Sequence, residues 1–394
     1  MVERVSGPSW RNEPPTFTLA SDHSLSRVPD GVQTCCYDLL FMEESSRADW
    51  VEARRPTLRD VAERAKVDPS LVSRVVNRDE SLRIPESTRE RVMHAVAEIG
   101  YRPNAAARGL RLARSNAIGL VVPDLANPIY SVIAQGAQME ASQTGYSILL
   151  ATYPPLEQVP TSRNSMIGLL AETRVDGILI ASGTSNNDLV HQLQDLDRPV
   201  VMVNRQLSGV DAAVTVDDEY GAFIATKLLL DRGHTRVGHV MGPTGIDTSE
   251  RRMAGYRKAM LAQGLVTKSH WITHSHSWGI GDGYEASLQL MKSAPELTAI
   301  FVSNVSLAIG LYRAASEQGH VIPDDLSVVA LHDYEITDYL LPPLTTVSLP
   351  LHELGRTAVQ HLISLLKGGE PKRMRIEADP LVMLRGSVGE PSTV

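Results

Sequence analysis

Cysteine is almost absent from this sequence, and so is any long apolar run. The chain of 394 residues has two cysteines, the neighbours Cys35 and Cys36. They exclude a framework of disulfides, and we expect a reducing compartment. No apolar run approaches the length of a membrane span. The N-terminus also lacks the charged start and apolar core of a secretion signal. We therefore expect a cytoplasmic protein with no membrane partner.

Positive charge is scarce over the whole chain but concentrated in one part of it. The formal net charge is −8. Residues 54–114 nevertheless hold 14 Lys and Arg against 8 Asp and Glu, whereas the rest of the chain holds 24 against 38. A short basic module on an acidic body is the charge pattern of a protein with a DNA-binding head.

Apolar residues follow helical spacing from about Thr57 to Gly100. Thr57 and Asp60 form a capping-box pattern at the start of a first helix. A second helix follows after a short break, since Asp68 suits an N-cap and Pro69 suits the first helical position. The positions that we expect to face inward are Val61, Ala62 and Ala65, then Val72, Val75 and Val76, then Val92, Val96 and Ile99 of a third helix starting near Pro85.

The second of these helices has a polar and cationic outer face. Ser70 and Arg74 are four residues apart and therefore lie on one side, with Ser73 close by. A short helix of this kind fits the major groove of DNA, where Arg reads guanine and Ser contacts phosphates or base edges. The alternative is a small helical bundle whose basic face is merely solvated.

After Ala117, short apolar runs alternate with segments of helical length. The runs are Ile118–Val122, Ser147–Ala151, Gly177–Ala181, Val200–Val203, Val237–Met241, Ala299–Val302 and Val328–Leu331. Such Val- and Ile-rich runs are typical of buried parallel strands joined by crossover helices. They predict an α/β body of two doubly wound parallel-sheet subdomains, in which ligands bind at the carboxyl ends of the strands.

Several motifs, in a fixed order, resemble the LacI/GalR family of transcription regulators. In the head they are Thr57-Leu58-Arg59-Asp60-Val61-Ala62, Val72-Ser73-Arg74-Val75-Val76-Asn77, Thr88-Arg89-Glu90-Arg91-Val92 and Gly100-Tyr101-Arg102-Pro103-Asn104. In the body they are Ile118–Asp124, Asn127-Pro128, Val175–Leu179, Gly233-His234 and Pro342–Val347. The resemblance covers about Thr57 to Leu384. It implies a small all-α helix-turn-helix domain followed by a periplasmic-binding-protein-like body.

The resemblance also implies how the chain is divided. We expect a disordered N-terminal extension at 1–53, with Met42 as an alternative start, and a helix-turn-helix domain at 54–102. A hinge helix would occupy 103–114, the effector-binding and dimerisation body 115–385, and a tail 386–394. In the family the hinge helices of a dimer pair, and a leucine at the position of Leu110 enters the minor groove. The alternative for the hinge is a plain Ala-rich linker.

The site residues that follow from the resemblance form two sets. Those expected to bind DNA are Thr57, Pro69, Ser70, Ser73, Arg74, Asn77, Asn104, Arg108 and Leu110. Those expected to bind the effector are Ile129, Tyr130, Asn204, Arg205, Arg252, Trp278, Asn304, His332 and Asp333. Some have simpler alternatives: Tyr130 and Trp278 as core aromatics, Arg252 as a surface residue beside an equally exposed Arg251, and His332 as a residue that only packs under the loop Asp333–Leu341.

The chain departs from the family pattern at several positions. In the head, Lys66 stands in the turn where the family has Gly, and Pro85 stands where it has Ser. In the body, Val305 and His332 replace carboxylates, and a polar residue near Leu349 is missing. The predicted cleft thus loses carboxylates while it keeps Arg205 and Arg252. We expect a sugar or a sugar-derived anion as ligand, which a protonated His332 would bind more tightly as the pH falls.

Three classes of function compete for this sequence. A solute-binding protein would need a secretion signal and no basic head. An enzyme would need a nucleophile elbow, a phosphate-binding Gly-Lys-Ser/Thr loop or zinc-ligand spacing, and none is found. The alternating His270, His274 and His276 have no Cys or acidic partner at ligand spacing. We therefore predict a homodimeric repressor that binds a palindromic operator under effector control and is not an enzyme, with no cofactor and no metal.

Overall fold

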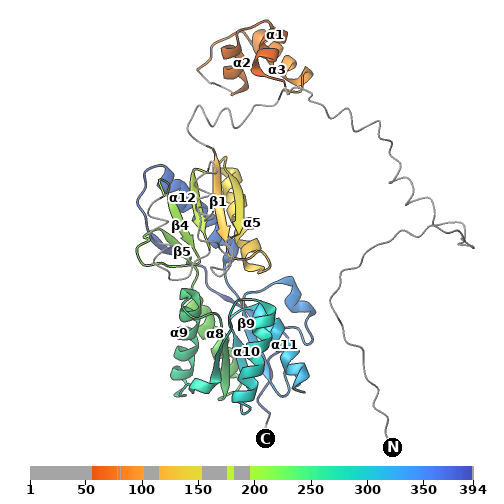
Figure 1. Cartoon of the computed structure of the whole chain (residues 1–394), viewed down its shortest axis with the longest axis vertical. Helices are drawn as coiled ribbons and strands as arrows, with labels where there is room; N and C mark the ends of the chain where they lie inside the picture. The colour runs from red at the N-terminus through yellow and green to blue at the C-terminus, as the bar shows by residue number, and fades with distance from the viewer. Residues whose placement is uncertain are drawn as a thin grey trace, which may run out of the picture. The chain divides into compact units, whose positions relative to one another are not determined.

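The computed structural model describes residues 56–77, 79, 81–101, 115–152, 175–181 and 196–392. The chain divides into two compact units between residues 103 and 104, and Figure 1 draws both. We call them the head and the body. The predicted extension at 1–53 and the predicted hinge at 103–114 lie outside the described residues. Within the described part, no helix is both long and apolar enough to cross a bilayer.

The head consists of three helices around one small apolar core. They are α1 (Leu58–Ala65), α2 (Pro69–Val76) and α3 (Glu86–Glu98). The capping box at the start of α1 is confirmed, because the backbone N–H of Thr57 donates to the Asp60 carboxylate at 2.6 Å while the Thr57 hydroxyl accepts from the Asp60 N–H. The buried core residues are Val61, Ala62, Ala65, Val72, Val75, Leu82, Val92 and Ala95.

The turn between α1 and α2 has the geometry that its sequence predicts. Lys66 is the C-cap of α1 and is left-handed, with φ 52° and ψ 51°. Asp68 then caps α2 by accepting the N–H of Ser70 at 2.8 Å, and Pro69 occupies the first turn of α2. A side chain with a Cβ is strained in this left-handed conformation, so Lys66 is a weak point of the turn.

The body contains two sheets of six strands each. The first has the order β11-β5-β4-β3-β1-β2, and the second has the order β12-β10-β9-β8-β6-β7. All neighbours are parallel except β10 and β12. The bounds are β1 Ala117–Val122, β2 Ser147–Thr152, β3 Gly177–Ile180, β4 Val200–Val203, β5 Ala213–Thr215, β6 Val237–Met241, β7 Ile272–His274, β8 Ala299–Val302, β9 Ser327–Leu331, β10 Thr345–Ser348, β11 Arg373–Arg375 and β12 Leu381–Met383.

Helices pack against both sheets and define two subdomains. Helices α5 (Ile129–Gln143) and α12 (Leu351–Leu366) pack in the core of the first sheet. Helices α8 (Asp218–Asp231), α9 (Asp247–Ala262), α10 (Ile280–Ser293) and α11 (Val305–Glu317) pack with the second sheet, with the 3-10 segments η3 (Ser269–Trp271) and η4 (Glu335–Tyr339). Gly136 and Gly355 let α5 and α12 approach closely, since a Cβ at either would lie 2.0 or 2.1 Å from a carbonyl oxygen of the other helix.

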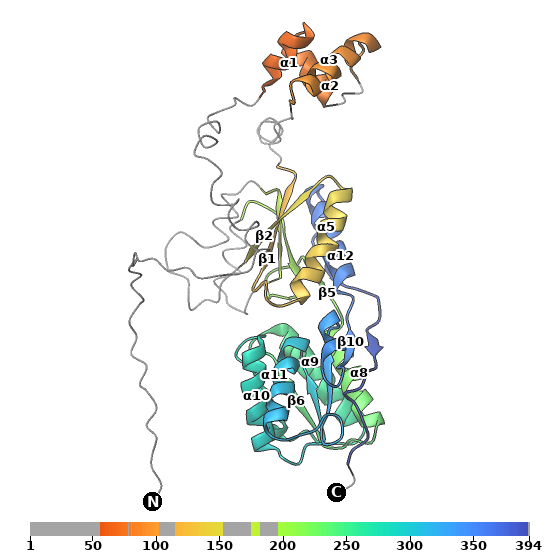
Figure 2. The same cartoon turned by 90° about the vertical axis from the view of Figure 1, so that its right-hand side faces the viewer.

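The chain crosses between the two subdomains three times (Figure 2). The first crossing joins β5 to α8, the second joins β10 to α12, and the third joins β11 to β12. The predicted tail at 386–394 does not leave the body at its first residue. Ser387 is fully buried and its hydroxyl donates to the carbonyl of Val328 at 2.6 Å, while Val388 joins the core. The body therefore extends beyond the predicted end at 385.

The left-handed geometry of Lys66 generates a prediction about the stability of the head. Lys66→Gly should stabilise the head by about 1 kcal/mol, because glycine adopts this conformation without a Cβ clash. Native-state hydrogen exchange of head amides in the full chain measures the change. Lys66→Ala is the matched control, since it removes the same charge but keeps the Cβ. Equal protection in the two variants would contradict the strain that we assign to this position.

Candidate functional site

The exposed face of α2 carries most of the residues predicted to contact DNA. Pro69, Ser70, Arg74 and Asn77 are exposed, and Ser73 is partly exposed. The Arg74 guanidinium is held in place by the Asp79 carboxylate at 2.7 Å and the Ser81 hydroxyl at 3.2 Å. The hydrogen bond that the Ser81 hydroxyl donates to Asp79, and next the one from Arg74, lower the pKa of Asp79 to about 2. A carboxylate on a short loop therefore orients the cation that we expect to face the groove.

Two other predicted DNA contacts have structural roles of their own. The Asn77 amide donates to the carbonyl of Ser73 at 2.7 Å, one helical turn earlier. The Thr57 hydroxyl is engaged in the capping box of α1. Ser70 and Arg74 lie on the exposed face of α2. Asn104, Arg108 and Leu110 lie outside the described residues.

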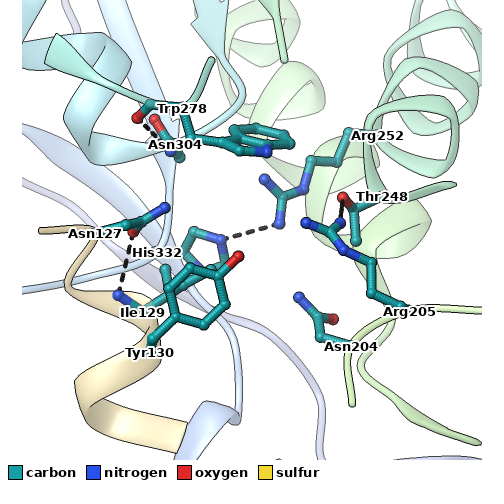
Figure 3. Close-up of a pocket in the computed structure, with 10 residues that line it drawn as sticks. All are labelled: Asn127, Ile129, Tyr130, Asn204, Arg205, Thr248, Arg252, Trp278, Asn304 and His332. Atoms are coloured by element: carbon teal, nitrogen blue, oxygen red, sulfur yellow. Dashed lines mark hydrogen bonds between the residues drawn. The ribbon is translucent and has the colours of Figure 1, made fainter. Parts of the chain in front are cut away.

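A pocket lies between the two subdomains of the body, at the carboxyl ends of the strands (Figure 3). Its lining consists of Asn127, Ile129, Tyr130, Asn204, Arg205, Thr248, Arg252, Trp278, Asn304 and His332. The space not filled by atoms is about 210 Å³. Part of this space is open solvent, and the side chains themselves enclose room for about one water molecule.

Arg252 is buried at the centre of the pocket lining, and its guanidinium is held by contacts on three sides. Nε and an Nη of Arg252 lie 2.8 and 2.7 Å from the same oxygen of the Asp218 carboxylate. A second Nη donates to the carbonyl of Ser303 at 2.8 Å. The Trp278 ring lies over the guanidinium, 5.2 Å from its carbon, in a cation–π contact. Arg252 is therefore a buried residue rather than a surface one.

His332 is a neutral residue, which corrects the expectation that it gains a proton near neutral pH. Its Nε2 lies 3.0 Å from an Nη of Arg252, and a guanidinium can only donate, so Nε2 accepts. Nδ1 then carries the hydrogen and is a donor. Complete burial and the adjacent Arg252 lower the pKa of His332 to about 3. Because ligand-free His332 is neutral, the predicted rise in affinity at lower pH requires that the bound ligand raise the pKa of this residue.

Arg205 enters the pocket from the end of β4, beside Thr248, and is the less compensated of the pocket's two cations (Figure 3). One Nη donates to the Thr248 hydroxyl, and the same atom lies 3.9 Å from the Asp247 carboxylate. Its Nε is buried and has no hydrogen-bond partner among the described residues. Asn204 precedes it with a left-handed φ of 56°, and that backbone geometry turns the chain at the end of β4.

Four buried hydrogen-bonding atoms of the pocket lining have no partner among the described residues. Arg205 Nε and His332 Nδ1 are donors, Asn204 Oδ1 is an acceptor, and the Tyr130 hydroxyl can act as either. No Asp or Glu lines the pocket. The Asp218 carboxylate, which does not line the pocket, is already paired with Arg251 and Arg252. A ligand that satisfies this lining must therefore supply more acceptors than donors.

Eight of the nine predicted effector residues line the pocket, and Asp333 does not. The Asp333 carboxylate instead accepts from Arg385 at 2.7 Å and from the Thr346 hydroxyl at 2.5 Å. The Asp333 side chain therefore ties the segment after β9 to the segment that follows β12. His332 has a left-handed φ of 72°, so the chain turns directly after β9 and sends Asp333 away from the pocket.

Two lining residues, Asn127 and Thr248, are absent from the predicted set. Thr248 precedes Arg252 by four residues on α9, so helical spacing alone places both on one face. Asn127 stands before α5, and its side-chain Oδ1 accepts the backbone N–H of Ile129 at 3.3 Å. The motif residue His234 has a structural role outside the pocket, since its ring contacts Thr298, Ser327 and the carbonyl of Gly389.

A helix-turn-helix head joined to a two-subdomain ligand-binding body defines a ligand-controlled DNA-binding regulator. A family model described as bacterial regulatory proteins, lacI family, matches residues 57–104, and a periplasmic binding protein-like domain matches residues 226–388. The chain is 31% identical to the ribose operon repressor of Escherichia coli K12 over 334 residues, covering 84% of this chain and 99% of that protein. It is 30% identical to the repressor PurR of Vibrio campbellii, covering 84% and 98%.

Solved structures agree with these relatives. The lac repressor dimer bound to operator and an anti-inducer superposes with a TM-score of 0.73 at 26% identity, covering 85% of this chain and 100% of that one. A complex of the regulator CelR with cellobiose has a TM-score of 0.65 at 29% identity, covering 84% and 100%. The chain belongs to the LacI family. Its function is therefore that of a DNA-binding transcriptional repressor with an effector-binding body, and not that of an enzyme.

The neutral state of His332 generates a prediction about pH. Unfolded histidine takes up a proton near its ordinary pKa of 6.5, whereas folded His332 does so only near 3. The free energy of unfolding should therefore fall as the pH drops from 6.5 towards 3, by about 1.4 kcal/mol per pH unit for each such group. The fully buried His239, whose pKa burial also lowers to about 3, contributes in the same direction.

Urea unfolding of the full chain between pH 8 and pH 5 measures this slope. His332→Asn should reduce it by about one proton, because the Asn oxygen can still accept from Arg252 but does not titrate. His276→Asn is the control, since that histidine is exposed and its variant should keep the slope of the parent chain. An unchanged slope in His332→Asn would show that His332 is not neutral and buried in solution.

Proposed function

We propose that α2 reads the operator through Ser70 and Arg74, and that a dimer reads an inverted repeat. Both side chains lie on the exposed face of a short second helix, which is the face that such motifs present to the major groove. Asn104, Arg108 and Leu110 complete the contact in the adjacent minor groove, as in the family. The target is DNA, so we infer that the protein acts in the cytoplasm, which fractionation of the producing cells tests.

The operator can be identified by selecting bound sequences from a random DNA pool. Arg74→Ala should then weaken binding to the selected operator by about 1–3 kcal/mol and weaken random DNA much less. Arg64→Ala is the matched control, because that arginine lies on α1 and pairs with Glu98. An equal loss on both DNAs would mean that Arg74 contacts only phosphates. Equal affinity for one and two half-sites would argue against a dimer that reads a palindrome.

We propose further that the effector is a monosaccharide derivative carrying a carboxylate or a phosphate. The observation that carries this proposal is the buried Nε of Arg205, which has no partner among the described residues, in a pocket that no carboxylate lines. An anion supplies the acceptors that this lining needs and meets the less compensated of its cations. Two of the similar proteins are named for a sugar or bound to one, the ribose operon repressor and the CelR–cellobiose complex.

Calorimetric titration of the full chain with ribose and with ribose 5-phosphate tests the ligand class. We expect the phosphate to bind at least about tenfold more tightly, and Arg205→Gln to remove most of that difference, since hydrogen bonds to charged groups contribute about 1.5–3 kcal/mol. Arg205→Lys retains the charge but not the planar guanidinium, so its preference for the phosphate should lie between those of the parent chain and of Arg205→Gln. Tighter binding of ribose, unaffected by Arg205→Gln, would assign the pocket to a neutral sugar.

A further inference from the structure

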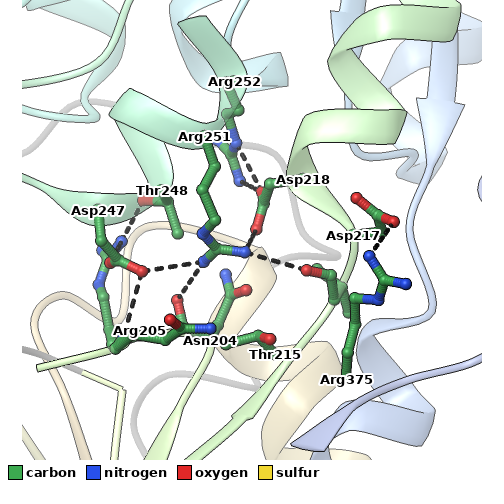
Figure 4. Close-up of polar contacts among 12 residues, drawn as sticks. Asn204, Arg205, Thr215, Asp217, Asp218, Asp247, Thr248, Arg251, Arg252 and Arg375 are labelled. Atoms are coloured by element: carbon green, nitrogen blue, oxygen red, sulfur yellow. Dashed lines mark hydrogen bonds and ion pairs between the residues drawn. The ribbon is translucent and has the colours of Figure 1, made fainter. Parts of the chain in front are cut away.

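A network of charged residues lies beside the pocket where the chain first crosses between the subdomains (Figure 4). We call it the crossover network, and it consists of Asp217, Asp218, Asp247, Arg251 and Arg375. Arg375, at the end of β11, pairs with Asp217 at 2.8 Å. The strand that leads into the third crossing is therefore tied to the first crossing. None of these residues lines the pocket.

Arg251 is the residue of the network that contacts both subdomains. It belongs to α9, in the second subdomain. One Nη donates to the carbonyl of Val216, in the first crossing, at 3.0 Å. The other Nη donates to the carbonyl of Asn204, in the first subdomain, at 3.4 Å and to Asp247 at 3.1 Å. The side chain is 22% exposed, so it is a largely covered bridge rather than the surface residue that its sequence position suggested.

Asp218 connects this bridge to the pocket. Its carboxylate is fully buried, and its two oxygens face different arginines. One oxygen receives the pocket residue Arg252, and the other lies 2.8 Å from an Nη of Arg251, in an ion pair. Burial alone would raise the pKa of Asp218, but Arg251 and Arg252 outweigh burial and hold that pKa below its ordinary value. A charged Asp218 therefore joins the pocket arginine to the bridging arginine.

Asp247 makes a second connection across the subdomains. Asp247 is the first residue of α9. One oxygen of its carboxylate accepts hydrogen bonds from the backbone N–H of Gln206 and from an Nη of Arg251, each at 3.1 Å. Gln206 directly follows the pocket residues Asn204 and Arg205. The segment after β4 is thus fastened to the start of α9 through one carboxylate. Arg251 and Asp247 are parts of the same attachment.

We propose that Arg251 is a positioning residue that holds the two subdomains together around the effector pocket. Val216 lies in the first crossing between the subdomains, and Arg251 donates to its carbonyl while it shares Asp218 with the pocket residue Arg252. Arg251 thus sets how readily the subdomains part, and it transmits the state of the pocket to the crossing. The proposal rests on the proposed function only in treating the pocket as the effector site.

Hydrogen exchange of the ligand-free full chain, read by mass spectrometry, tests the bridge without any effector. Arg251→Met should speed exchange about tenfold in peptides covering 203–207 and 214–218, because a lost charge-assisted hydrogen bond weakens these contacts by that order. Strand β8 should exchange as before. Arg257→Met is the matched control, an exposed arginine on the same helix, and should match the parent chain throughout.

Two further variants make the outcome decisive. Asp247→Asn should reproduce the effect in 203–207, and the double variant should add little to either single one, since both residues belong to one attachment. Arg251→Lys serves if Arg251→Met does not fold, with a smaller change at the same peptides. A uniform rise that includes β8, or no change at 203–207 and 214–218, overturns the proposal. Faster exchange in these peptides together with no response to ribose or ribose 5-phosphate would leave the bridge intact and count against the proposed ligand alone.

Discussion

The body of this protein depends on one buried carboxylate, that of Asp218. A charged group removed from water is strongly destabilising unless it is paired, and Asp218 is paired with Arg251 on one oxygen and Arg252 on the other. Arg252 in turn fixes the tautomer of His332 and lies under Trp278. The orientation of the pocket lining and the contacts at the first crossing thus share one anion. Removing it would leave the buried Arg252 without a counter-charge and Arg251 with Asp247 alone.

The predictable part of the fold is the part that local chemistry determines. The seven apolar runs became strands β1 to β4, β6, β8 and β9. All of them but β2 are largely buried, and a strand buried on both faces is apolar along its whole length, whereas β2 is an edge strand with several exposed residues. The other five strands, β5, β7, β10, β11 and β12, lie outside these runs. β11 and β12 are exposed three-residue edges, so no apolar run marks them. The capping box of α1 and the cap of α2 were predictable from residues adjacent in sequence.

The pocket was predictable in its position and less so in its electrostatics. Asn204, Asn304 and His332 follow the ends of strands and line the pocket, as the family resemblance implies. The partner of Arg252 is a different matter, since Asp218 lies 34 residues earlier in the chain, after a strand of only three residues. Without that partner the site looked strongly electropositive and His332 looked protonated. In the folded chain Asp218 supplies the counter-charge of Arg252 without lining the pocket, and His332 is buried.

Effector control follows from the difference in ligand affinity between an open and a closed pocket, because a ligand that binds both equally shifts nothing. Arg251 and Asp247 join the subdomains through contacts with Asn204 and Gln206. Under the proposed role of Arg251, these contacts favour the arrangement of the subdomains described here before any ligand binds. Under the proposed function, the ligand supplies the remaining free energy through Arg205 Nε, His332 Nδ1 and the Tyr130 hydroxyl, which have no hydrogen-bond partner among the described residues. Stronger contacts from Arg251 and Asp247 raise ligand affinity, but they leave a smaller difference between the ligand-free and the ligand-bound populations. The crossover network therefore limits how far an effector can shift operator binding.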